Sequence, residues 1–161
     1  MKTVATTDLC DHYLEELTVA EPIGFKDFGK RKSFHGEIVT IHCPENNPLV
    51  RKTLGENGKG KVLVVDGEGS TKCALMGDNI AKLAVENGWE GVIINGCIRD
   101  SAEISTLDVG VKALNVIPVK SGKKETGVLN IAVDFAGVTF VPGEFVYADE
   151  DGIVVSPKKY Y

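Results

Sequence analysis

Three charged residues stand where predicted strands of the sequence pass into predicted helices. Asp78 comes after a strand predicted at 61–66 and a glycine loop, and the pair Arg99-Asp100 follows a strand predicted at 91–95. Neighbouring parallel strands would bring both helix starts to one edge of a sheet, where backbone N–H groups attract anions. At such an edge Asp100 could bind a hard divalent cation, and Arg99 could hold a substrate carboxylate with two parallel hydrogen bonds.

The same three residues also fit a purely structural role. Asp is a common N-cap of helices, so Asp78 and Asp100 would each cap the helix that they begin. Arg99 beside Asp100 would then form a surface ion pair. Residue types alone favour this structural role and leave the binding site open as the alternative.

A glycine loop, Gly67-Glu68-Gly69-Ser70, follows the strand at 61–66 and so has the place of a dinucleotide-binding loop. The fingerprint fails because Lys72 stands where its third glycine belongs, and the sequence contains no Gly-Lys-Ser/Thr of a P-loop. The loop therefore indicates a turn with positive φ angles. A phosphate or adenosylmethionine site stays as the weaker alternative.

Composition places the chain among ordinary globular proteins. It has 161 residues, of which 43% are hydrophobic and 25% charged, so we expect a single domain over 1–161. The net charge of −5 argues against direct nucleic-acid binding. No apolar run is long enough to span a membrane, and residues 1–8 lack the apolar segment of a signal peptide. The four dispersed cysteines fit free thiols, and together these features predict a cytoplasmic protein.

Periodicity predicts helices early in the chain and strands throughout. Asp8 and Asp78 are the expected N-caps of the first and third helices. The helices are expected at 9–17, 48–54, 79–87 and 100–107, and the strands at 37–41, 61–66, 91–95, 109–119, 128–134, 137–141, 145–148 and 153–155. This order predicts a mixed α/β domain with a strand-rich core.

Several runs of the sequence resemble the RraA-like family, which comprises 4-hydroxy-4-methyl-2-oxoglutarate aldolases and regulators of ribonuclease E activity. The runs lie at 8–11, 58–67, 86–91, 95–100 and 147–153. Aldolases of the family share the signature D-X20-R-D-X2-E/D. Asp78, Arg99, Asp100 and Glu103 fill every position of it, with 99 − 78 − 1 = 20 residues between the first two.

The resemblance implies a fold and an assembly. The fold would be a compact β/β/α sandwich of the phosphohistidine-swivelling-domain type. The assembly would be a homotrimer or a dimer of trimers, with sites between subunits.

The resemblance also implies an activity, metal-dependent cleavage of 4-hydroxy-4-methyl-2-oxoglutarate to pyruvate, with oxaloacetate decarboxylation as a side reaction. Both reactions leave electrons on an enolate, which a lysine Schiff base or a metal ion must stabilise. We expect no lysine in the site, since Lys61 opens a strand and Lys82 lies on a helix face. The metal route is therefore favoured, with Asp100 as the implied ligand of Mg²⁺ or Mn²⁺.

The substrate would be a small 2-oxo acid. By resemblance, Gly77, Asp78, Asn79 and Ile80 cradle its carboxylate with backbone N–H groups, and Arg99 holds it and offsets the charge of the enolate. Asp78 would orient a water that takes the hydroxyl proton. Glu103 would orient Asp100 from one helical turn away.

Two alternatives to the aldolase stay open. Some family members inhibit RNA processing by binding ribonuclease E, and an acidic protein could cover a basic RNA channel. Regulators tend to lose the Asp of the Arg-Asp pair, which this chain keeps, so an enzyme is favoured. A methyltransferase rests only on the glycine loop. Within that loop Glu68 departs from the family pattern and would add a carboxylate to the rim of the site.

Overall fold

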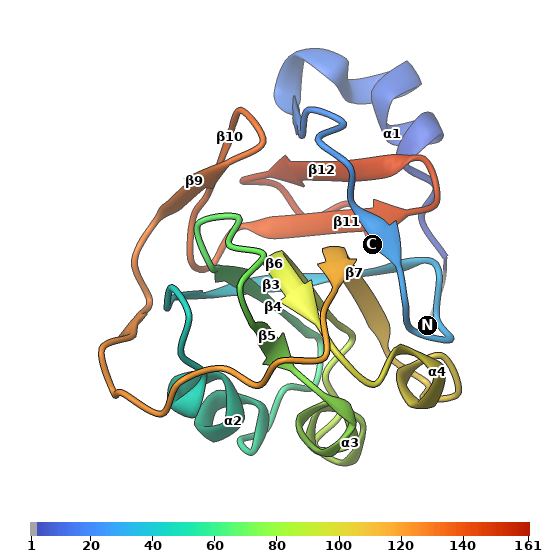
Figure 1. The fold of residues 1–161 in the computed structure, drawn as a ribbon. Coiled ribbons are helices and arrows are strands. Elements are labelled where there is room, and N and C mark those ends of the chain that lie inside the picture. The colour runs from blue at the N-terminus through green and yellow to red at the C-terminus, as the bar shows by residue number, and fades with distance from the viewer. Residues whose placement is uncertain (1–2) are drawn as a thin grey trace.

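The computed structural model describes residues 3–161, which form one large mixed sheet, a separate hairpin and a few short helices (Figure 1). The strands are β1 (Thr18–Val19), β2 (Lys26–Asp27), β3 (Phe34–His42), β4 (Lys61–Asp66), β5 (Ala74–Met76), β6 (Gly91–Ile98), β7 (Gly110–Val116), β8 (Val128–Leu129), β9 (Val133–Phe135), β10 (Val138–Phe140), β11 (Phe145–Asp149) and β12 (Gly152–Ser156). The helices are α1 (Thr6–Tyr13), the 3₁₀ turn η1 (Leu14–Glu16), α2 (Pro48–Leu54), α3 (Asp78–Glu86) and α4 (Ser101–Ile104).

The centre of the sheet is parallel and its outer strands are antiparallel. The order is β1-β12-β11-β3-β4-β6-β7-β2, with β5 paired to β6 and β8 paired to β3 outside this path. The pairs β3-β4, β4-β6 and β6-β7 are parallel. All eight residues of β6 are buried, which is typical of a parallel strand covered on both faces.

Alternate residues of the central strands fill two separate cores. On β4, Leu63 and Val65 pack with side chains of α2, α3 and α4, whereas Val62 and Val64 pack with β9, β10, β11 and β12. Successive side chains of a strand point to opposite faces, so one apolar run supplies both cores. Figure 1 shows α2, α3 and α4 along one side of the central strands and the β9-β10 hairpin on the other.

The mixed α/β fold with a strand-rich core is confirmed, and several element bounds differ from prediction. α2 and β4 occupy the predicted residues, whereas β6 continues three residues beyond the predicted end at 95. The predicted N-caps are wrong, because Ala5 precedes α1 and Gly77 precedes α3, with no side-chain cap bond at either. The strands β1, β2 and β5 were not predicted.

None of the helices within residues 3–161 has the length and apolar character needed to cross a membrane. The four cysteines are free, as expected, and Cys43, Cys73 and Cys97 are buried.

The ring of Phe34 packs directly on the backbone of two glycines. Gly91 of β6 and Gly110 of β7 are register partners, and a β-carbon on either would stand 2.2 Å or 2.0 Å from a ring atom of Phe34. Phe34 is 3% exposed, so its ring has little room to move.

We therefore expect Gly110→Ala to lower the free energy of unfolding by about 1–3 kcal/mol, the usual cost of overpacking a core. Urea denaturation of the purified variant measures this. The matched control is Gly55→Ala, where a β-carbon would come no closer than 3.3 Å to its nearest neighbour. Equal stability of the two variants would contradict this account of the Phe34 packing.

Candidate active site

The short strand β5 pairs with the second half of β6 and brings two helix starts together. Met76 and Ile98 are register partners, and the backbone N–H of Arg99 donates to the Met76 carbonyl at 3.0 Å. β5 leads into α3 and β6 leads into α4, so Asp78 and Asp100 become neighbours. The predicted meeting of two helix starts is correct. The strand ends expected at 66 and 95 are not the ones that form it.

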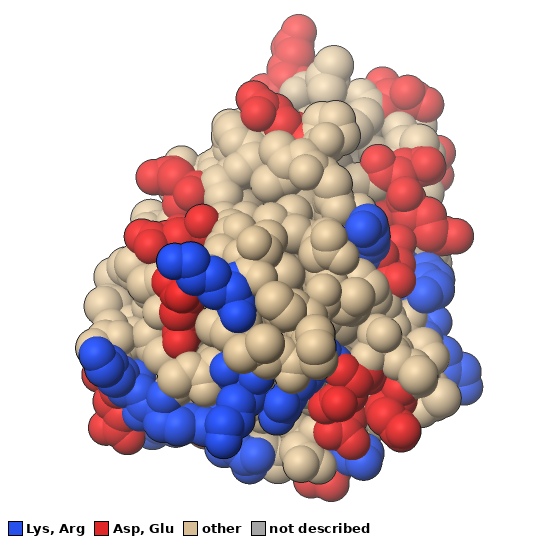
Figure 2. All heavy atoms as spheres, in the orientation of Figure 1, with Lys and Arg blue, Asp and Glu red and all other residues tan. Residues whose placement is uncertain are grey.

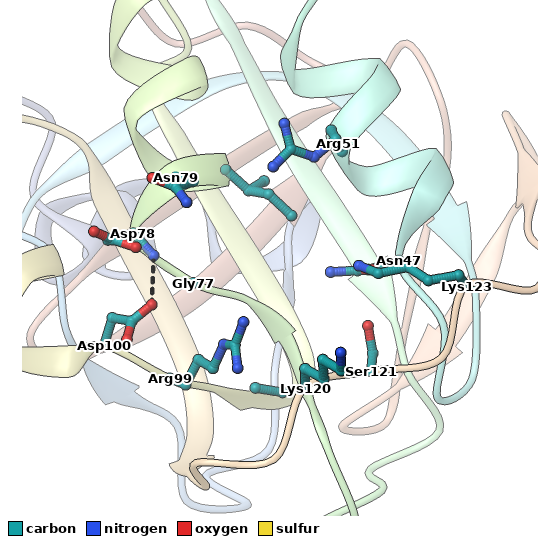
Figure 3. Close-up of a pocket in the computed structure, with 12 residues that line it drawn as sticks. Asn47, Arg51, Gly77, Asp78, Asn79, Arg99, Asp100, Lys120, Ser121 and Lys123 are labelled. Atoms are coloured by element: carbon teal, nitrogen blue, oxygen red, sulfur yellow. Dashed lines mark hydrogen bonds between the residues drawn. The ribbon is translucent and has the colours of Figure 1, made fainter.

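Asp100 binds the start of α3 rather than capping its own helix. The backbone N–H of Asp78 donates to Oδ2 of Asp100 at 3.0 Å (Figure 3). Neither α3 nor α4 has a side-chain cap bond, so the interpretation as two ordinary N-caps is wrong. Asp100 has left-handed backbone angles, φ 57° and ψ 41°, which residues other than glycine rarely adopt outside special sites.

Gly77 leaves the space that this contact needs. A β-carbon at Gly77 would stand 2.6 Å from Oδ2 of Asp100 and 3.4 Å from the Arg99 side chain. A larger residue would therefore push the carboxylate away from the N–H group of Asp78.

The carboxylate of Asp78 is held by a cation on the next turn of α3. Lys82 Nζ lies 3.3 Å from Asp78 Oδ2. Burial raises the pKa of the Asp78 carboxyl, but the hydrogen bond from Lys82 and the charge of Lys82 outweigh it, so the pKa lies below its ordinary value. Asp78 is therefore ionised at neutral pH and acts as a hydrogen-bond acceptor.

One pocket collects almost all of the predicted site residues. Those residues are Gly77, Asp78, Asn79, Ile80, Arg99 and Asp100. Glu103 does not line the pocket. It is exposed on α4, and within residues 3–161 no hydrogen bond or ion pair joins its side chain to Asp100.

The glycine loop does not line this pocket. Glu68 and Gly69 have φ angles of 58° and 70°, which confirms the predicted turn with positive φ. Oδ1 of Asp66 accepts hydrogen bonds from the Glu68 N–H at 2.9 Å and from the Asn95 amide at 3.0 Å, and these bonds shape the loop. The Glu68 carboxylate lies 3.3 Å from the His42 ring instead of at the rim of the site, so the prediction for Glu68 is wrong.

Five polar residues that line the pocket were not predicted as site residues. They are Asn47, Arg51, Lys120, Ser121 and Lys123. The expectation of a site without lysine is therefore wrong. Asn47 precedes α2 and Arg51 lies within it. The other three lie in an irregular segment after β7, where no periodic pattern distinguishes them from an ordinary loop.

The residues present suit a cation that keeps most of its water. Within residues 3–161 no three His, Cys, Asp or Glu side chains come together as a metal cluster. Mg²⁺ is commonly bound through one or two carboxylates, with waters and substrate oxygens as its other ligands. Asp100 offers such a carboxylate, because its bond to Asp78 engages only one of its two oxygens.

The chain is similar to known proteins over nearly its whole length. The model of the RraA-like family, described as Aldolase/RraA, matches residues 6–155. A protein of Alkalilimnicola ehrlichii with the provisional name 4-hydroxy-4-methyl-2-oxoglutarate aldolase is 56% identical over 154 residues, covering 96% of this chain and 95% of its own.

Two solved structures are also similar over most of both chains. One is described as an S-adenosylmethionine:2-dimethylmenaquinone methyltransferase from Geobacillus kaustophilus, with a TM-score of 0.95, 48% identity, and coverage of 97% of this chain and 96% of that one. The other is the RNA-processing inhibitor RraA from Thermus thermophilus, with a TM-score of 0.94, 43% identity, and coverage of 100% and 96%. Sequence signature, site geometry and family match agree, and the chain belongs to the RraA-like family.

Proposed function

We propose that this protein is a divalent-metal-dependent aldolase that cleaves 4-hydroxy-4-methyl-2-oxoglutarate into two molecules of pyruvate. The observation that carries the proposal is the junction of α3 and α4, where Arg99 and Asp100 meet the first turn of α3 in one pocket. Relatives at 56% identity over nearly the whole chain bear the name of this aldolase.

The cleavage breaks the bond between C3 and C4 of the substrate. As the C4 hydroxyl loses its proton, C4 becomes the carbonyl carbon of one pyruvate. The electron pair of the broken bond moves to C3 and the C2 oxygen as the enolate of the other pyruvate. Protonation of that enolate at C3 completes the second product.

The chain's own residues bind and orient the substrate in this scheme. The N–H groups of Asn79 and Ile80 lie in the first turn of α3, where they have no carbonyl four residues earlier in the helix, so they would donate to the substrate carboxylate. Arg99 holds the same carboxylate and offsets the charge that develops on the enolate oxygen. The ionised Asp78 carboxylate accepts a hydrogen bond from the water that takes the hydroxyl proton.

Asp100 is the proposed ligand of Mg²⁺ or Mn²⁺. When bound there, the cation supplies positive charge that stabilises the developing enolate. Gly77 and the Asp78 N–H hold the Asp100 carboxylate in place, because one leaves it room and the other fixes one oxygen at 3.0 Å. We propose that Glu103 orients Asp100, and its place in the signature supports this role.

The two lysines of the pocket raise the alternative of a Schiff base. A lysine that attacks a carbonyl must be neutral, and such lysines are desolvated or stand beside other cations. Lys120 and Lys123 are both exposed. Arg51 and Arg99 line the same pocket, so trapping with borohydride is needed to test a Schiff base directly. We favour the metal route because neither lysine is desolvated and Asp100 offers a carboxylate oxygen for a cation.

We also propose oxaloacetate decarboxylation as a side activity, because loss of CO₂ leaves the same pyruvate enolate. The free cysteines support the proposed cytoplasmic location. The family resemblance supports the finer fold assignment, a β/β/α sandwich of the phosphohistidine-swivelling-domain type. It also supports a homotrimer or a dimer of trimers. Exposed apolar side chains such as Val116, Val119 and Val128, each at least 44% exposed, suit burial between subunits.

Regulation of a ribonuclease is the second candidate function. The 43% identity to a protein described as an RNA-processing inhibitor favours it, and a separate surface could serve it. Immobilised ribonuclease E should then retain this protein and the variant Asp100→Asn equally well. No retention of either would remove this candidate.

Replacing Asp100 should abolish turnover. We expect Asp100→Ala and the isosteric Asp100→Asn to lower kcat/KM for 4-hydroxy-4-methyl-2-oxoglutarate at least about 1,000-fold, because the carboxylate that holds the cation is lost. A coupled assay of pyruvate release measures the loss. Glu86→Gln, which removes one exposed carboxylate near the end of α3, is the control and should keep full activity. Near-normal kcat in Asp100→Asn would remove Asp100 from its role.

Chelation should distinguish stabilisation of the enolate by a metal ion from stabilisation by a lysine Schiff base. Treatment with EDTA should abolish both pyruvate release and oxaloacetate decarboxylation, and added Mg²⁺ or Mn²⁺ should restore both, since the same cation stabilises both enolates. Sodium borohydride with substrate should leave the mass of the protein unchanged. A trapped adduct on a lysine, or activity that survives chelation, would contradict the metal assignment.

A further inference from the structure

The end of the pocket opposite Asp78 and Asp100 has no role in the scheme above. Figure 3 shows Lys120, Ser121 and Lys123 at this end, with Arg99 between them and the two carboxylates and Arg51 reaching toward the pocket from α2. We call these three residues the distal cluster. All of them come from the segment that follows β7.

Ser121 carries a buried hydroxyl group that no other described residue satisfies. The residue is 4% exposed and lines the pocket. Within residues 3–161 its Oγ has no hydrogen-bond partner. Nearly all buried polar groups are hydrogen-bonded, so an unpaired hydroxyl at a pocket wall indicates a ligand that completes it.

The ammonium group of Lys123 hydrogen-bonds to a neutral amide and not to a carboxylate. Its Nζ donates to Oδ1 of Asn47 at 3.1 Å, and the Asn47 amide in turn donates to the Leu75 carbonyl at 3.0 Å. Asn47 is 7% exposed, so it forms a fixed anchor. Because Asn47 is neutral, no carboxylate offsets Lys123 in this bond, and Nζ has further protons to donate to a ligand.

Backbone contacts fix the distal cluster on both sides. The Val119 carbonyl accepts from the Ala74 N–H at 2.8 Å, and the Gly122 N–H donates to the Glu45 carbonyl at 3.0 Å. These bonds bracket Lys120 and Ser121 and place them beside β5. The cluster is therefore positioned before any ligand arrives, which lowers the entropic cost of binding.

The charge of the pocket is opposite to that of the protein. Four cations line it, Arg51, Arg99, Lys120 and Lys123, against two carboxylates, one of which is paired with Lys82. The chain as a whole carries a net charge of −5. Figure 2 shows Lys and Arg side chains gathered over α2 and the segment after β7, beside a smaller acidic group.

We propose that the distal cluster binds the second carboxylate of a dicarboxylic 2-oxo acid, the one farther from the carbonyl. The inference rests on the proposed function, in which Arg99 and the first turn of α3 take the other carboxylate. Two ammonium groups and a hydroxyl suit a carboxylate, which only accepts hydrogen bonds. This carboxylate stays ionised throughout the cleavage, so the cluster binds substrate and transition state alike and acts mainly on KM.

Two substrates that differ only at this group test the proposal. They are 4-hydroxy-4-methyl-2-oxoglutarate and 4-hydroxy-4-methyl-2-oxopentanoate, in which a methyl group replaces the distal carboxylate. The double variant Lys120→Gln/Lys123→Gln should lose about 10- to 100-fold in kcat/KM for the dicarboxylate, mostly through KM, and less than about 3-fold for the monocarboxylate. Lys124→Gln removes an exposed charge beside Lys123 but outside the pocket lining, and should leave both values unchanged.

Ser121→Ala separates a binding role from a structural one. The hydroxyl has no hydrogen-bond partner among residues 3–161, so the variant should keep or raise the Tm while KM for the dicarboxylate rises. A lower Tm with an unchanged KM would assign Ser121 to the fold and overturn its part in the cluster.

The outcomes distinguish this proposal from the proposed function. Equal losses on both substrates in the double variant would show that the lysines act at the shared end of the substrate, which overturns the distal cluster and leaves the aldolase intact. If the unaltered protein cleaves neither substrate, the aldolase itself fails, and the cluster's assignment fails with it.

Discussion

The candidate site depends on a short parallel pairing between β5 and the last residues of β6. Through it the Arg99 N–H reaches the Met76 carbonyl at 3.0 Å, and both strands pass directly into helices. The starts of α3 and α4 are then neighbours, and the Asp78 N–H reaches the Asp100 carboxylate at 3.0 Å. Without this pairing, the 20 residues between Asp78 and Arg99 would not bring the two together.

Two unusual backbone positions make that contact fit. Asp100 adopts left-handed angles, which Asp tolerates better than most residues with a side chain. Gly77 has no β-carbon, and one would stand 2.6 Å from the Asp100 carboxylate. The backbone turn at one position and the missing side chain at the other serve the same contact.

Local charge, and not the net charge, decides what this pocket attracts. The chain as a whole carries a net charge of −5, yet Arg51, Arg99, Lys120 and Lys123 make one pocket cationic. The ion pair between Lys82 and Asp78 reduces the opposing negative charge further. A small molecule with two carboxylates matches this arrangement better than a single anion does, because cations stand both beside the Asp78–Asp100 pair and at the distal end.

The sequence by itself determined the mixed α/β class, the helix at 48–54, the strand at 61–66 and six residues that line the pocket. These features depend on local patterns: apolar periodicity, a proline at a helix start, and a signature of fixed spacing. Only the tertiary structure decided that β5 exists, that Asp100 binds α3 instead of capping α4, and that the distal cluster joins the pocket. A three-residue strand is too short to show a period. Lys120, Ser121 and Lys123 line the same pocket as Asp100 only because backbone pairing holds the segment after β7 against β5.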